Sequence, residues 1–341
     1  MTPVPRGFGG PLVDLDGAID LHFHSYPCLF PRLADDVEVA VAAREMGFRA
    51  LLYKCHHESS VSRAMYLETL VPGLRVFGGV VLNSYVGWMN PAAVEAALRL
   101  GARAVWMPTV DAGYHAEVHG STGRYGTQSG GRESADGYWV LDDAGKLRAE
   151  VQEVLALVAE HDVMLGTSHL SPREIVALVP AARAAGIEKV SITHPFYKVP
   201  GLDLDVLADL VAQGAVAEFE YCGISPMWHV AQVEAIVAAV ERLGAANCIL
   251  VSDAGQRHNP IAPEALRVLA QTVHEKGVPL ADVEQMIKGN PAAILGIDHI
   301  DDGDARERRE RWGGLLGGTP GTPGAPAGAV GIDGGAPVGA L

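Results

Sequence analysis

Ile19-Asp20-Leu21-His22-Phe23-His24 is the stretch on which the interpretation of the whole chain depends. Three apolar residues alternate with three polar residues, which is the period-2 pattern of a β-strand. The pattern predicts that the three apolar side chains point to one side of the strand and the three polar side chains to the other. Two imidazoles two residues apart on one strand face can bind a single metal ion. A strand with two hydrogen-bonded histidines would give the same pattern, so the rest of the chain must decide.

The composition is that of a large folded protein with an acidic surface. Hydrophobic residues make up 48 % of the 341 residues, and the formal net charge is −15. So acidic a chain is not expected to bind nucleic acid. The four cysteines (Cys28, Cys55, Cys222 and Cys248) are far apart and form no CxxC motif. This spacing argues against a disulfide framework and against a zinc ribbon.

Neither a targeting segment nor a membrane-spanning segment is expected. The N-terminus lacks a basic-then-apolar signal, and no apolar run is long enough to span a bilayer. Together with the scattered cysteines, this predicts a protein of the reducing cytoplasm.

Apolar strands and helices alternate along most of the chain. The predicted strands are residues 19–24, 49–54, 75–83, 103–109, 163–168, 189–193, 215–221 and 248–252. The predicted helices are residues 35–46, 59–70, 90–101, 150–160, 171–186, 204–213, 226–243, 263–276, 282–287 and 291–295. Eight strand-then-helix units in about 250 residues are typical of a closed (β/α)8 TIM barrel. An open doubly wound sheet is the alternative, but the glycine-rich fingerprint it usually carries after the first strand is missing.

Two segments depart from this rhythm. Residues 110–146, after the fourth strand, are rich in Gly, Ser, Tyr and His. They predict a long excursion with a hairpin around Tyr138-Trp139-Val140, of the kind that forms lids or binding loops. Residues 301–341 are a charge run followed by Gly, Pro and Ala, which cannot build a core. We therefore expect one barrel domain over residues 1–300 and a disordered tail over 301–341.

Histidines and an aspartate recur where the predicted apolar strands stop. In a barrel of this kind the carboxyl ends of the strands surround one mouth, and catalysis takes place there. The polar residues at these ends are His22 and His24, then Lys54, His56 and His57, then His169, His194 and Asp253. Four imidazoles and a carboxylate form a ligand set for a divalent transition metal, first of all Zn²⁺, with Mn²⁺ and Fe²⁺ as alternatives.

The order of these residues resembles the amidohydrolase superfamily. The shared pattern is His-x-His on strand one, His on strands five and six, and Asp on strand eight. Residues 243–256, which contain Ile249-Leu250-Val251-Ser252-Asp253, are similar to the eighth-strand region of these hydrolases, and residues 289–296 are similar to their closing helix. The resemblance extends over about residues 18–297.

The resemblance implies the roles of several residues. His22 and His24 would bind a metal ion, while His169 and His194 would either complete that site or hold a second ion. Asp253 would touch the water that the metal activates and accept its proton. One ion is favoured, with two as the alternative. Asp253, His194 and Lys54 are the candidate catalytic residues.

Strand four departs from the superfamily pattern. Val105-Trp106-Met107-Pro108-Thr109 offers neither the carboxylated lysine nor the glutamate that often bridges two ions. Lys54, on strand two, is a candidate to replace this bridging residue. A salt bridge to Glu218 or Glu220, or a contact with substrate, is favoured over carboxylation of Lys54.

Three further histidines are candidates for substrate binding. His56 and His57 are adjacent, so at most one of them faces the mouth. His115 follows the fourth strand closely enough to reach a substrate.

The sequence thus predicts a metal-dependent hydrolase that acts on a C–N or C–O bond of a small polar molecule, such as an amide, a cyclic amide or a lactone. A decarboxylase using the same site is one alternative, and a non-catalytic metal-binding barrel is the other. The expected partner is a small molecule, without nucleic acid or membrane, and a homodimer is an open alternative because barrels of this kind often pair.

Overall fold

The computed structural model describes residues 11–297, so the predicted tail at 301–341 lies outside the described residues. Its main sheet has eight parallel strands, hydrogen-bonded in the order β1-β2-β3-β4-β7-β8-β9-β10. These strands are β1 (Ile19–Phe23), β2 (Ala50–Tyr53), β3 (Arg75–Val81), β4 (Ala104–Trp106), β7 (Met164–Gly166), β8 (Val190–Thr193), β9 (Ala215–Glu220) and β10 (Cys248–Val251). Each strand is followed along the chain by one or more helices, as predicted.

The first and last strands of the sheet meet and nearly close the barrel. The backbone N–H of Asp253 donates to the carbonyl of His22 at 2.7 Å. The Ser252 N–H donates to the carboxylate of Asp20 at 3.1 Å, so a buried side chain replaces one bond of the ladder at this seam. The predicted (β/α)8 barrel is therefore confirmed.

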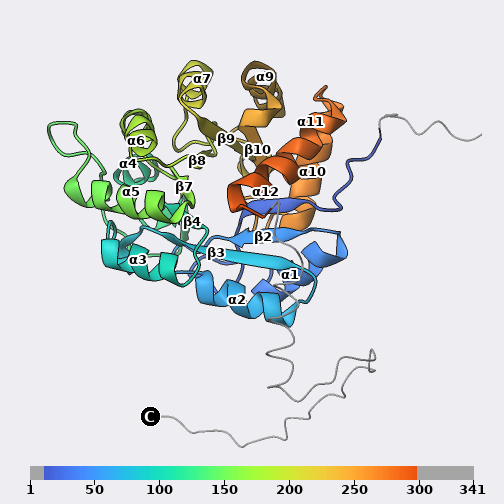
Figure 1. The fold of residues 1–341 in the computed structure, drawn as a ribbon, viewed down its shortest axis with the longest axis horizontal. Helices are drawn as coiled ribbons and strands as arrows, with labels where there is room; N and C mark the ends of the chain where they lie inside the picture. Colours follow the sequence, from blue (N-terminus) through green and yellow to red (C-terminus); the bar gives the residue numbers. More distant parts are fainter. Residues whose placement is uncertain (1–10, 298–341) are drawn as a thin grey trace, which may run out of the picture. The chain divides into compact units, whose positions relative to one another are not determined.

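The helices surround the strands (Figure 1). In chain order they are α1 (Asp36–Glu45), α2 (Val61–Leu70), α3 (Pro91–Arg99), α4 (Gly113–His119), α5 (Ala149–His161), α6 (Pro172–Ala184), α7 (Leu204–Ala212), α8 (Tyr221–Ile224), α9 (Val233–Leu243), α10 (Ala262–Glu275), α11 (Leu280–Glu284) and α12 (Asn290–Leu295). Short segments η1 (Ser84–Val86), η2 (Ala245–Asn247) and η3 (Gln285–Gly289) join some of them. No helix within residues 11–297 is both long enough and apolar enough to cross a bilayer.

The core consists of two apolar clusters, one between the strands and the helices and one inside the barrel. Helix α12 contributes Ile294 and Leu295 to the inner cluster. The side chain of Asn290 donates to the carbonyl of Cys248, where β10 begins. Helix α12 therefore closes the end of the barrel at which the strands begin, and the other end is left for a site.

A bulge in β1 makes part of the predicted alternation wrong. The pairing of β1 with β2 shifts by one residue between Asp20 and Phe23. Ile19 and Leu21 consequently belong to the cluster inside the barrel, whereas Phe23 packs in the outer cluster. A β-bulge places one extra residue in a strand and redirects the side chains that follow it. The apolar residues of the opening stretch therefore do not share one face.

One other local prediction is wrong. The helix expected over residues 226–243 begins only at Val233, since His229 adopts a left-handed backbone (φ +41°) that a right-handed helix cannot contain.

The long excursion contains two antiparallel turns. The one near the predicted position pairs Leu141 with Leu147, and the Arg148 N–H donates to the Val140 carbonyl at 3.0 Å. The other, which was not predicted, is the hairpin of β5 (Arg124–Tyr125) and β6 (Gln128–Ser129), where Gly126 supplies the positive φ of the turn.

Gly79 on β3 packs against the ring of Trp106 inside the barrel, so substitution of this glycine measures how densely the inner core is packed. A Cβ at this position would lie 2.6 Å from the Trp106 ring and against the carbonyl of Ala104. We expect Gly79→Ala to lower the free energy of unfolding by about 2–3 kcal/mol, the scale of overpacking in a dense core. Urea unfolding followed by circular dichroism measures this change. Gly289→Ala is the matched control, because the nearest atom lies 4.0 Å away; a similar loss in both variants would contradict the explanation.

Candidate metal centre

Strained backbone marks three of the strand ends at the mouth of the barrel. Ser168, His194 and Asp253 adopt φ values of +52°, +33° and +44°, a region that non-glycine residues seldom occupy. Each costs about 1 kcal/mol or more and persists only where the surrounding structure enforces it. Such conformations cluster at functional sites. Here they accompany His169, His194 and Asp253, which are site residues predicted from the sequence.

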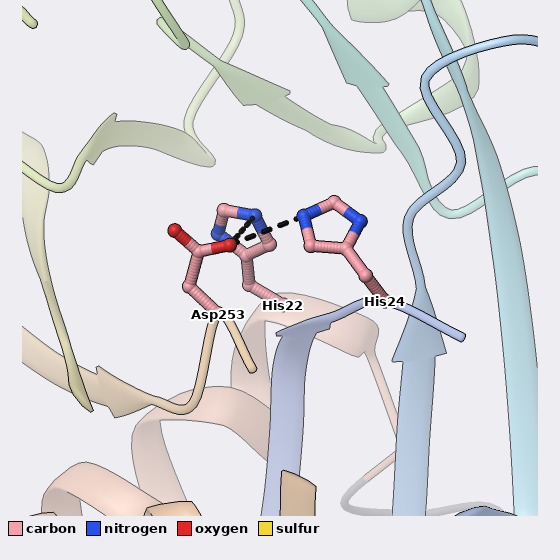
Figure 2. Close-up of side chains that lie close together, drawn as sticks. All are labelled: His22, His24 and Asp253. Carbon is pink, nitrogen blue, oxygen red and sulfur yellow. Dashed lines mark ion pairs between the residues drawn. The ribbon is translucent and has the colours of Figure 1, made fainter. Parts of the chain in front are cut away.

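His22, His24 and Asp253 come together at the seam between β1 and β10, with both rings facing the carboxylate (Figure 2). The Nε2 atoms of His22 and His24 each lie 3.1 Å from Oδ1 of Asp253. One potential ligand atom from each residue lies within 4.8 Å of the others. Two atoms bound tetrahedrally to a metal at about 2.1 Å would be roughly 3.4 Å apart, so these spacings suit a single ion.

The outer nitrogens of both rings are fixed by hydrogen bonds. Nδ1 of His22 lies 2.8 Å from the carboxylate of Glu218, which is fully buried and also accepts from Ser191. Nδ1 of His24 lies 2.9 Å from the carbonyl of Lys54. Both partners can only accept, so each Nδ1 donates. Each Nε2 is then left to bind a metal ion or, without one, to share a proton with Asp253.

The electrostatics of this group favour an added positive charge. Burial raises the pKa of Asp253, but the charges and hydrogen bonds of His22 and His24 lower it well below its usual value. Burial lowers the pKa of His22, yet the charge of Asp253 and hydrogen bonds to Asp253 and Glu218 raise it above its usual value. Burial and the charge of Arg32 lower the pKa of His24 to about 3. An anionic oxygen facing two nitrogen lone pairs is stable only with a cation or proton between them, and a divalent metal fits that position.

His169 and His194 lie beside this group rather than within it. The ring centroids of His22 and His194 are 6.1 Å apart, and those of His169 and His194 are 5.1 Å apart. Nδ1 of His194 is buried and has no hydrogen-bond partner within the described residues. The structure therefore brings all five predicted ligands to one end of the barrel, with three of them in a compact set.

His115 does not reach the cavity and instead packs behind His169. Its Nδ1 lies 2.9 Å from Nδ1 of His169, and its Nε2 lies 2.9 Å from the carbonyl of Arg124. Burial lowers the pKa of His115 to about 3 and the pKa of His169 well below its usual value, so both rings are neutral. The Arg124 carbonyl requires the proton of His115 on Nε2. Nδ1 of His115 then accepts from His169, whose Nε2 is left free to bind a metal ion.

Removing this contact is expected to weaken metal binding. Without the acceptor, the proton of His169 distributes over both nitrogens and the ring loses its orientation. Second-sphere losses of this kind typically cost tenfold to a hundredfold in metal affinity, and we expect that range for His115→Ala. Competition with a chelator gives the affinity. His119→Ala is the control because its ring stacks on His115 (4.4 Å) on the same helix; equal effects from both variants would contradict a specific role for His115.

Lys54 is buried without the predicted salt bridge. Its Nζ has no hydrogen-bond partner within residues 11–297 and lies 5.4 Å from the centre of the Trp106 ring. Burial lowers its pKa to about 8, although Asp253 and Glu218 act against this shift. Glu218 is engaged by His22 and Ser191 instead, which explains why the ion pair does not form.

The two adjacent histidines after β2 separate as expected. His56 lines the cavity, where its ring stacks on His24 at 4.6 Å and its Nδ1 lies 2.9 Å from the hydroxyl of Thr109. His57 turns away and bonds through Nε2 to the carbonyl of Gly130 in the long excursion.

A cavity adjoins the candidate metal site. The space not filled by atoms, including the part open to solvent, is about 500 Å³. His24, His56, His169, His194 and Asp253 lie on its floor and sides. Sequence analysis missed the remaining lining residues, above all Arg32, Phe30, Tyr125, Tyr197 and Trp228. Four of them come from loops and Tyr125 from the two-residue strand β5, where no strand or helix period indicates which way a side chain points.

Residues 17–218 match the model of a protein family described as a family of unknown function, DUF6282. The matched segment is more than half of the chain. The chain belongs to the DUF6282 family. The match contains four of the five predicted ligands of this DUF6282 protein and ends at Glu218, before Asp253. No curated protein matches the sequence.

Several solved structures are similar in fold to this DUF6282 protein. A putative 2-pyrone-4,6-dicarboxylic acid hydrolase from Pseudomonas putida has 16 % identity and a TM-score of 0.54, covering 83 % of this chain and 99 % of its own. An amidohydrolase from Pseudomonas aeruginosa has 14 % identity and a TM-score of 0.55, covering 82 % of this chain and 95 % of its own. A 2,6-dihydroxybenzoate decarboxylase from Rhizobium has 11 % identity and a TM-score of 0.50, covering 83 % of this chain and 99 % of its own. The chain therefore shares its fold with two hydrolases and a decarboxylase.

Proposed function

We propose that this DUF6282 protein is a metal-dependent hydrolase of a C–N or C–O bond in a small polar molecule, such as an amide, a cyclic amide or a lactone. The observation that carries the proposal is the convergence of His22, His24 and Asp253 beside a cavity that His24 and Asp253 line, with the outer nitrogen of each ring fixed by an acceptor. A purely structural ion would not need a cavity beside it.

Each of the site residues would have a distinct role in such a reaction. His22, His24 and Asp253 would hold a divalent ion, with His169 and His194 at its side. When bound, the ion polarises a carbonyl oxygen and lowers the pKa of a water molecule. Asp253, whose side chain is 13 % exposed, is the group that can accept a proton from water in the cavity and return it to the leaving atom. His194, which lines the cavity, would contact the polarised oxygen, and the buried Nζ of Lys54 would stabilise negative charge.

Several finer features belong to this proposal. Zn²⁺ is the proposed metal because imidazoles and a carboxylate suit it, and one ion is favoured because the compact set has three residues, two histidines and one aspartate. All four cysteines are free, which supports a cytoplasmic location. His56 is the predicted substrate contact that lines the cavity.

Decarboxylation at the same site is the second candidate, because one structure with this fold is a decarboxylase. One experiment separates the possibilities. The purified protein is analysed for metal ions per chain, then assayed before and after chelation and metal addition with a panel of lactones, amides, cyclic amides and aromatic carboxylic acids. Metal-dependent ring opening or amide cleavage supports the proposal. Release of carbon dioxide without water addition supports the alternative, and a metal-loaded protein without turnover supports a binding protein.

A further inference from the structure

A cationic side chain lines the cavity without a carboxylate partner among the described residues. Arg32 lies in the loop after β1, and its Nε is buried with no hydrogen-bond partner within residues 11–297. Its side chain interacts with the thiol of Cys28, which is not a carboxylate. A buried donor without an acceptor is costly, and a guanidinium presents a planar fork of donors suited to a carboxylate.

The backbone around Arg32 is hydrogen-bonded to the loop that carries Asp253. The backbone of Arg32 pairs with that of Gln256 in an antiparallel bridge, and the Leu33 N–H donates to the Gly255 carbonyl at 2.9 Å. The guanidinium carbon also lies 5.8 Å from the centre of the Phe30 ring. The cation is therefore held at a fixed place relative to the proposed base, as a substrate-orienting group must be.

Arg32 is the only lysine or arginine among the residues lining this cavity in the described part of the chain. A phosphate group usually requires several cationic or amide donors, whereas a carboxylate is satisfied by one guanidinium. A singly charged carboxylate thus suits this wall better than a phosphate.

The other walls are aromatic. The ring of Tyr125 lies 5.3 Å from that of Phe30 and 6.2 Å from that of Trp228, which in turn lies 6.5 Å from Tyr197. The Nε1 of Trp228 is a second buried donor with no partner in the described part of the chain. Flat aromatic walls favour a flat ligand, because stacked or edge-to-face contacts need a planar partner.

We infer that the substrate is a small planar carboxylate, which binds Arg32 through its carboxylate and lies between the aromatic side chains of Phe30, Tyr125 and Trp228. This inference rests on the proposed function, because the reacting bond must then lie over His22, His24 and Asp253. The carboxylate is a handle for orientation and is not itself altered.

Calorimetric titration of the metal-loaded protein with benzoate and with benzamide tests the charge of the ligand. The two probes have nearly the same shape and differ in charge. Benzoate is expected to bind at least tenfold more tightly, and Arg32→Gln to weaken benzoate tenfold to a hundredfold while changing benzamide little. Arg99→Gln is the matched control, since Arg99 is 73 % exposed on α3. Cyclohexanecarboxylate tests planarity and is expected to bind several-fold more weakly than benzoate.

Each outcome bears on the inference. A preference for benzoate that survives in Arg32→Gln would place the carboxylate elsewhere, for example on the metal, and would overturn it. The same holds if benzoate does not bind to the metal-loaded protein, or if benzoate and cyclohexanecarboxylate bind equally. Failure of the proposed function looks different, because it would appear as protein without metal or without hydrolysis of neutral lactones, which are measured on the same samples.

Discussion

Replacing His22 or His24 by alanine is expected to reduce the metal content of the purified protein from about one ion per chain to below about a tenth, and to lower hydrolysis roughly a thousandfold or more. Each ring supplies an Nε2 lone pair directed at the position that Asp253 also faces. With one of three ligands of the compact set removed, the remaining two cannot hold the ion against competition from water. Elemental analysis after dialysis, together with turnover, measures both effects.

The two variants differ in a way that separates metal loss from misfolding. His22→Ala leaves Glu218 buried without its imidazole partner, which destabilises the fold in addition. His24→Ala only frees the backbone carbonyl of Lys54. His161→Ala, a partly exposed histidine on α5, is the control. A His24→Ala protein that is folded by circular dichroism and still binds a full equivalent of metal would contradict the assigned centre.

The fold and the floor of the site were predictable because both follow from periodic features of the sequence. Apolar strands recur with helices between them, so the positions at which strands end could be counted, and His169, His194 and Asp253 were found there. The topology of a parallel barrel then brings these positions to one mouth without any further information.

The parts that could not be predicted depend on contacts between residues distant in sequence. Glu218 bonds to His22 across 196 positions, and no local pattern distinguishes this from a salt bridge to Lys54. His115 was expected at the substrate, but a seven-residue helix in the long excursion, α4, holds it behind His169. Arg32 belongs to a loop whose course is fixed by the loop after β10, so its place in the cavity is a property of the folded chain.

Asp253→Asn is expected to retain much of the metal while lowering kcat by about a hundredfold to ten-thousandfold, the usual contribution of a general base. Asparagine has nearly the same shape, and its amide oxygen can still face His22 and His24 at the place of Oδ1, 3.1 Å from both Nε2 atoms. It cannot accept a proton. The carboxylate can do so at neutral pH, because the neighbouring imidazoles hold its pKa well below its usual value and keep it ionised.

The measurement is metal content and kcat on the same preparation, at saturating substrate, with Asp253→Ala alongside. In Asp253→Ala the ligand oxygen is lost as well, so metal content and turnover should fall together. A normal kcat in Asp253→Asn would show that another group accepts the proton. If instead Asp253→Asn lost metal and activity in parallel, as Asp253→Ala should, the carboxylate would be a ligand alone, and the proton acceptor would have to be sought among His56, His169 and His194 around the same cavity.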